Sequence, residues 1–130
     1  MARRIYQYSK PYCRVLEFDG NKWVQLGQTI EGERRAAWVG ASVSLSRSGD
    51  RLVVGSPGDQ GSGVKASGHA TVFRLTSNRH WLRQGSALLA STSASSYFGF
   101  TVAVSDTEPS RVAIGGPDGN DGWVRVYQEL

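Results

Sequence analysis

One stretch of this chain is written twice, and no other feature constrains the fold as strongly. Residues 39–57 return as residues 98–117, with the glycines and the closing proline of the two copies aligned. The offset is 59 residues from Gly40 to Gly99 and 60 from Pro57 to Pro117, so one residue is gained across the segment. A repeat of this period is typical of a solenoid, a propeller or an array.

The sequence repeat extends beyond that segment. Trp23 recurs as Trp81, and Val15 recurs as Val72 and as Val126. Short β-favouring segments alternate with Gly, Ser, Asn, Asp and Pro, and no stretch has a sustained helical periodicity, which indicates an all-β fold. The predicted strands are 12–18, 22–26 with a tail toward residue 30, 41–45, 51–54, 70–75, 81–85, 100–104, 111–114 and 123–127, with 5–8 as a possible tenth.

The strands of each unit differ in a graded way. Residues 41–45 and 100–104 alternate Val or Leu with small residues, 51–54 and 111–114 are almost continuously apolar, and the strands with Trp23 and Trp81 are otherwise polar. This gradient predicts β-propeller-type repeats of four-stranded antiparallel blades, in which the first strand lies innermost and the tryptophan strand forms the rim. The 130 residues then form a single repeat domain of about two blades. It comprises a partial blade at 12–30, a full blade at 39–85 and a partial blade at 98–128.

Composition narrows the classes of partner. The net charge is +4, but the arginines are scattered and form no dense basic run, so a solvated surface is a better interpretation than a nucleic-acid interface. No apolar run approaches membrane-spanning length, and residues 1–8 lack the apolar core of a secretory signal, which leaves localisation open. The single cysteine, Cys13, lies in an alternating apolar segment and is expected to be a buried small hydrophobe.

Short motifs at the ends of the predicted strands carry a resemblance to a known family. Val39-Gly40 and Gly55-Ser56-Pro57 return as Phe98-Gly99 and Gly115-Gly116-Pro117, and residues 14–20 read RVLEFDG ahead of Trp23. With these motifs the chain resembles the FG-GAP repeats of integrin-α-like β-propellers over residues 12–128. The resemblance implies a non-catalytic binding or adhesion module, often extracellular.

Many members of that family carry a calcium loop rich in Asp and Asn between the first two strands of a blade. Here the corresponding loops read SRSGD at 46–50 and SDTEPS at 105–110, which offer few oxygen ligands for so hard a cation. We therefore expect no metal at either loop.

The sequence contains few motifs that are typical of enzymes. His69 and His80 lie in different predicted strands and are not spaced as a metal pair. No nucleophile elbow, zinc-protease helix or phosphate-binding loop occurs, and the glycine-rich segment 57–63 lacks the Lys-Ser/Thr ending of such a loop. We expect a protein without catalysis and without a cofactor.

Two features are candidates for ligand binding. The segment between the second and third strands is six residues longer in the full blade than in the last unit, and it carries Asp59 and Gln60 and leads to His69. Trp38 and Trp123 occupy positions where other copies have Tyr97 and His69, and a tryptophan near a loop mouth can stack on a sugar ring. The alternatives are a loop without contacts, a packing or rim position for His69, and ordinary packing for both tryptophans.

The sequence thus predicts a propeller-type binding or assembly module for a protein or other ligand, with a sugar-binding lectin and a basic nucleic-acid binder as alternatives. The first unit lacks its two inner strands and the last lacks its rim strand. Unpaired edges attract other strands, so we expect self-association into a trimer or a dimer through the open blade edges, unless the chain is a piece of a longer propeller.

Overall fold

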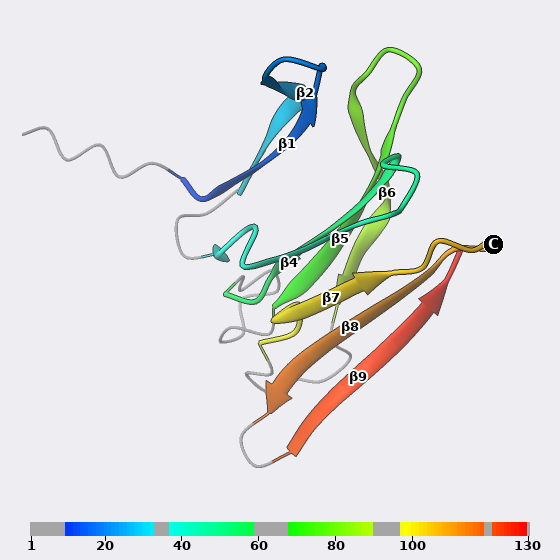
Figure 1. The fold of residues 1–130 in the computed structure, drawn as a ribbon. Helices are drawn as coiled ribbons and strands as arrows, with labels where there is room; N and C mark the ends of the chain where they lie inside the picture. The colour runs from blue at the N-terminus through cyan, green and yellow to red at the C-terminus, as the bar shows by residue number, and fades with distance from the viewer. Residues whose placement is uncertain (1–9, 33–36, 59–67, 90–96, 119–120, 130) are drawn as a thin grey trace, which may run out of the picture.

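The protein is described by a computed structural model covering residues 10–32, 37–58, 68–89, 97–118 and 121–129. It is all-β, with three antiparallel sheets of which none closes on itself in these ranges (Figure 1). The first sheet pairs β1 with β2, the central sheet has the order β3-β4-β5-β6, and the last sheet has the order β7-β8-β9. The strands are β1 (Tyr12–Phe18), β2 (Trp23–Glu31), β3 (Ser42–Leu45), β4 (Arg51–Ser56), β5 (His69–Leu75), β6 (Trp81–Leu89), β7 (Thr101–Val104), β8 (Arg111–Asp118) and β9 (Asp121–Gln128).

These nine strands coincide with the nine main predicted segments, and their order within each sheet follows the chain. The expected strand at residues 5–8 lies outside the described residues. Strand β2 includes the expected tail toward residue 30, whereas β6 and β8 each run four residues further than expected. Strands β2 and β6 each continue past a bulge beside the inner neighbour. Gly27 and Gly85 adopt left-handed φ angles of 74° and 66° in these two strands, a conformation that glycine adopts readily.

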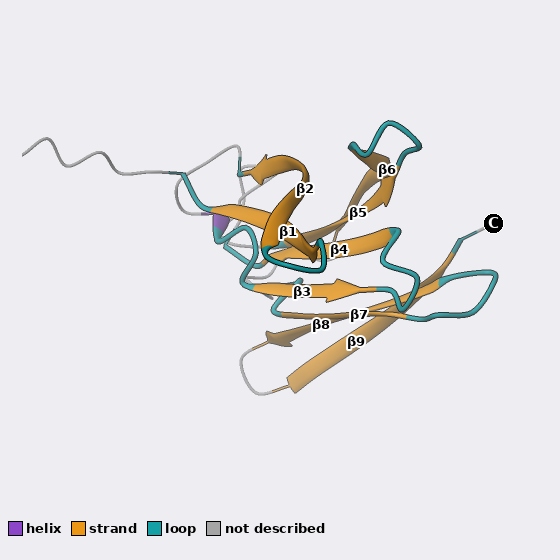
Figure 2. Ribbon diagram, turned by 45° about the horizontal axis from the view of Figure 1, so that its top comes forward, coloured by secondary structure: helices purple, strands orange, loops and turns teal. Residues whose placement is uncertain are grey.

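The central sheet is packed on both of its faces. The hairpin β1–β2 lies on one side of it and β7–β9 on the other, as Figure 2 shows. Strand β4 is buried along its whole length. Leu52 and Val54 pack toward the first sheet with Val15, while Val53 packs toward the last sheet with Ile114. Burial on both faces explains why residues 51–54 are almost continuously apolar.

The junction between the first and central sheets is organised by Trp81. Its side chain is only 2% exposed, and its Nε1 donates a hydrogen bond of 2.9 Å to the carbonyl oxygen of Leu26. The ring lies against Gly27, where an added Cβ would come 2.6 Å from its Cδ1 atom. Gln28 completes the contact with two hydrogen bonds to the backbone of Trp81. A glycine notch in β2 thus receives the tryptophan of β6.

The junction between the central and last sheets has a second glycine contact. A Cβ added to Gly55 would lie 2.0 Å from the carbonyl oxygen of Gly99. The same oxygen accepts a hydrogen bond of 2.8 Å from Ser42 Oγ. At the repeat-equivalent Gly115, Thr101 Oγ1 would lie 2.6 Å from an added Cβ. An added Cβ would therefore collide with a neighbouring atom at both glycines.

An arginine joins the same two sheets at their other end. Arg51 on β4 is buried, and its guanidinium lies 2.5 Å from Glu108 and 3.3 Å from Glu129. The hydrogen bond with Glu108 raises the pKa of Arg51, so the group stays charged. Buried guanidinium groups need such partners to offset their desolvation.

Trp23 does not share the environment of its repeat equivalent. Trp81 is buried, whereas Trp23 is 66% exposed and contacts Phe18 at a ring separation of 5.5 Å. The reason is the position of the first sheet, which has the central sheet on one face and no described sheet on the other.

Replacing Gly55 with valine should lower the free energy of unfolding by on the order of 1–3 kcal/mol, because the new side chain collides with the Gly99 carbonyl and Ser42. Gly122→Ala is the matched control, since the nearest atom to its added Cβ lies 4.0 Å away. Chemical denaturation of both variants measures the difference. Equal stability of Gly55→Val and the unaltered chain would contradict this packing.

Candidate functional site

The predicted ligand-binding residues that can be placed lie at one end of the sheets. Trp38 precedes β3, His69 begins β5, and Trp123 lies near the start of β9. Asp59 and Gln60 lie outside the described residues. The hairpin turns at residues 19–21, 46–50 and 76–80 connect the strands at the opposite end.

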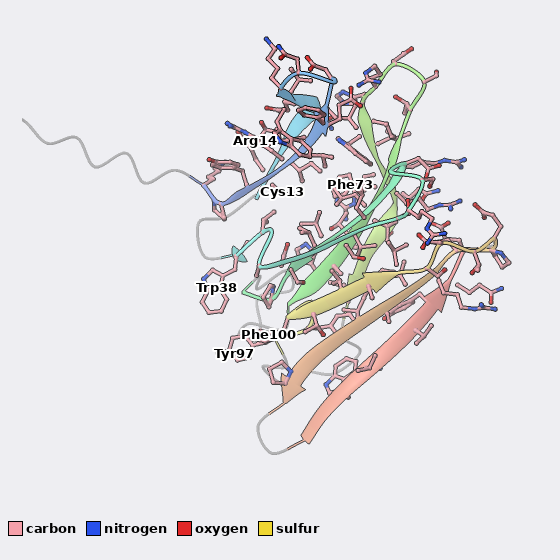
Figure 3. The ribbon with its side chains drawn as sticks, viewed as in Figure 1. Cys13, Arg14, Trp38, Phe73, Tyr97 and Phe100 are labelled. Atoms are coloured by element: carbon pink, nitrogen blue, oxygen red, sulfur yellow. The ribbon has the colours of Figure 1, made fainter. Side chains whose placement is uncertain are left out.

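Two aromatic rings project together at this end. Trp38 is 52% exposed and Tyr97 is 38% exposed, and their rings are nearly parallel with centroids 6.2 Å apart. The two residues are repeat equivalents that precede β3 and β7, and Figure 3 shows them on the same side of the molecule as Phe100. The packing of neighbouring sheets therefore places equivalent aromatic residues side by side.

The backbone holds both rings outward at an energetic cost. Trp38 and Tyr97 have φ angles of 53° and 45°, a left-handed conformation that costs a residue with a side chain on the order of 1–3 kcal/mol. Each begins a four-residue turn, closed by hydrogen bonds of 3.0 Å from Ala41 N to Trp38 O and from Phe100 N to Tyr97 O. The turns are fixed by glycine, because Gly99 packs against the backbone of the central sheet. Strain repeated at two exposed aromatics is typical of a functional position.

Trp123 has a different environment. Its ring is half-buried and stacks on the buried ring of Phe98, with the ring centroids 4.9 Å apart. The Arg125 guanidinium lies over the Trp123 ring, with its Cζ atom 4.9 Å from the ring centroid. It also packs against the core between the central and last sheets. Of the two off-pattern tryptophans, Trp123 packs as the alternative interpretation expected, whereas Trp38 does not.

His69 lines a cleft between the first and central sheets. The cleft has a volume of about 440 Å³ and combines apolar walls from Ile30, Val54 and Phe73 with polar groups. The polar lining includes Glu31, Ser56, Thr71 and Arg83. A half-open cleft with a few polar groups and both signs of charge suits a small polar ligand or a short segment of another chain. Val39, the residue after Trp38, also lines it, so the cleft adjoins the aromatic pair.

The loops at the opposite end use their carboxylates internally. Asp50 accepts hydrogen bonds from the hydroxyls of Ser46 and Ser48, and Asp106 accepts one of 2.5 Å from the amide of Arg47. The bond from Ser48 lowers the pKa of Asp50. Within the described ranges no three His, Cys, Asp or Glu side chains gather as metal ligands.

Cys13 is partly buried and packs against the core between the first and central sheets. Burial raises the pKa of its thiol, which disfavours the reactive thiolate.

The described ranges contain no helix long and apolar enough to cross a membrane.

Sequence reasoning missed Tyr97 as a candidate ligand-binding residue. Its signal was present, since Tyr97 stands 59 residues after Trp38 and both precede a glycine by two positions. What the sequence does not give is the distance between the two turns, which depends on how the sheets stack.

The chain was compared with protein-family models and with curated protein sequences, and it matches none of them.

Acidification tests the role of Asp50. Because its pKa is lowered in the folded state, its stabilising contribution is present above the ordinary carboxyl pKa and is lost as pH falls through the folded value. Asp50→Asn should lower the free energy of unfolding near neutral pH by no more than about 1 kcal/mol, since solvent screens this group. Denaturation across a pH series should show the gap narrowing in acid, and Ser48→Ala should act in the same direction. A gap that is constant with pH would contradict this assignment.

Proposed function

We propose that the chain is a non-catalytic, propeller-type repeat module that binds a ligand at the end of its sheets bearing Trp38 and Tyr97. The exposed aromatic pair is the observation that carries the binding role. Evenly repeated, strained and solvent-facing rings offer a rigid apolar platform. The adjoining cleft adds hydrogen-bonding groups and two opposite charges.

The propeller-type arrangement has its own support. The central sheet has four antiparallel strands in chain order. Its first and last strands, β3 and β6, carry the exposed apolar side chains of Val43, Leu45 and Leu82. Sheets packed face to face through equivalent positions are what a radial arrangement of blades requires. The FG-GAP resemblance of the repeat motifs points to the same class, in which binding or adhesion outside the cell is common.

A sugar-binding, lectin-like role is the second candidate. Parallel aromatic faces suit the apolar face of a sugar ring, and the polar cleft suits its hydroxyl groups. A protein ligand would use the same rings as buried anchors, because aromatic side chains dominate many protein interfaces.

Replacing Trp38 with alanine should weaken ligand binding by on the order of tenfold or more, because it removes half of the aromatic platform. A panel of neutral glycans on an array, followed by calorimetry on the best binder at two salt concentrations, measures the effect. Binding of a sugar should change little with salt, whereas binding to phosphates would fall steeply.

The matched control is His80→Ala, which removes an exposed ring at the opposite end of the sheets. Glycan binding that survives both Trp38→Ala and Tyr97→Ala at full strength would contradict the placement of the site. Binding that is lost in both variants and kept in His80→Ala would support the lectin-like candidate.

A further inference from the structure

Two contacts between sheets are made inside this chain, and in both cases the repeat-equivalent residues elsewhere in the described ranges do not make the same contact. At the first junction, the notch at Gly27 holds the indole of Trp81. Gly85 is the repeat equivalent of Gly27 with nearly the same φ, yet no atom of the described residues lies within 4 Å of the Cβ position there. Trp23 is the equivalent of Trp81, and it is largely exposed. The chain therefore presents a notch without a tryptophan and a tryptophan without a notch.

The second junction repeats the pattern at the inner strands. The turn carbonyl of Gly99 sits on Gly55, beside Ser42. Gly115, the equivalent of Gly55, has the corresponding Thr101 hydroxyl beside it, but in the part of the chain that the structure describes no turn carbonyl lies within 3 Å of its Cβ position. Gly40 is the equivalent of Gly99, and among the described residues the atoms within 4 Å of its Cβ position belong to Tyr12 and Cys13 on β1. Because Tyr12 is the equivalent of His69, which Gly99 contacts, what Gly40 lacks is a counterpart of Gly55.

Exposed apolar side chains follow the same two gaps. Val43 and Leu45 on β3 are exposed, whereas their equivalents Val102 and Val104 on β7 pack into the core beside the central sheet. Leu82 on β6 is 59% exposed, and it points away from the first sheet because its neighbour Trp81 points toward it. The uncovered surfaces are those that an adjacent pair of inner strands and an adjacent rim strand would cover.

Resting on the propeller-type module proposed above, we infer that the chain binds a second copy of itself, with Trp23 of one copy docked in the Gly85 notch of the next and Gly40 of the first docked on Gly115 of the next. Both contacts join the same two copies in the same direction. Strands β7 and β8 of one copy then form a four-stranded sheet with β2 of the other. Its third strand is either β9 or β1, which are repeat equivalents, and the strand that is not used leaves the pair that it forms within its own chain. The occupant must be a unit of this repeat, because the open surfaces carry the tryptophan and the glycines of the filled junctions at equivalent positions.

This contact is directional, since each copy uses one surface to donate Trp23 and another to receive it. Such head-to-tail contacts close into rings when the rotation per copy allows it. Each copy supplies about two sheets, so two or three copies would reach the number of blades found in propellers.

One departure from the internal junction is expected to weaken the contact. Gln28 clamps the backbone of Trp81, but the residue at its equivalent position on β6 is Ser86, which is too short for the same pair of bonds. The hydrogen bond from the indole nitrogen has an equivalent acceptor in the carbonyl of Gln84, which corresponds to Leu26. The docked Trp23 is therefore held mainly by the notch and by this one bond.

The test is the mass of the full chain in solution, measured by light scattering behind a sizing column over a dilution series. The unaltered protein should have two or three times its 14.1 kDa chain mass. Trp23→Ala removes the ring and Gly85→Ala fills the notch, so each variant should run as a monomer. An equimolar mixture of the two should form a species of two chains, because each variant keeps the half that the other lacks.

Matched controls separate loss of the contact from loss of the fold. Trp38→Ala removes another exposed tryptophan, and Gly49→Ala places a side chain at a left-handed glycine with open space around it; both should keep the mass of the unaltered chain. Far-UV circular dichroism and thermal melting show that each variant is folded. A chain that is monomeric at every concentration, an unchanged mass in folded Trp23→Ala, or a mixture that stays monomeric would overturn the inference. Each of these outcomes leaves the effect of Trp38→Ala on glycan binding, and hence the proposed function, to be judged separately.

Discussion

The structure depends on one strand that is covered from both sides. Strand β4 gives Leu52 and Val54 to one core and Val53 to the other, so its alternation ties the first and last sheets to the central one. A strand with apolar side chains on both faces cannot be stable in a single isolated sheet, because one of its faces would stay exposed to water. Its neighbours are the repeat-equivalent faces of adjacent units, which is why a repeat sequence gives stacked sheets here and why contacts between sheets recur at equivalent residues.

Close contacts between sheets are made by glycine opposite a bulky or backbone group. Trp81 fits on Gly27, and the Gly99 carbonyl fits on Gly55 beside the Ser42 hydroxyl. The contact between Gly99 and Gly55 holds the central and last sheets together beside the turns before β3 and β7, and the stacked rings of Trp38 and Tyr97 follow from that spacing. The proposed ligand site is therefore a product of how the sheets stack.

The sequence predicted the strands and their order well, because hydrophobic patterning, turn residues and the repeat all pointed to the same nine segments. It could not assign Trp23 and Trp81 to different environments, since the two share a local sequence pattern and differ only in whether a sheet covers them. For the same reason it could not tell that Trp38 faces solvent beside Tyr97 while Trp123 stacks on Phe98. Asp59 and Gln60 remain predictions.

A crystal structure of the assembled protein would show directly how equivalent residues meet between units. We expect the Trp23 indole of one copy to lie on Gly85 of the next and to donate its hydrogen bond to the Gln84 carbonyl, as Trp81 does to Leu26 within the chain. Copies that meet through other surfaces, with Trp23 in solvent and Gly85 still open, would contradict this expectation.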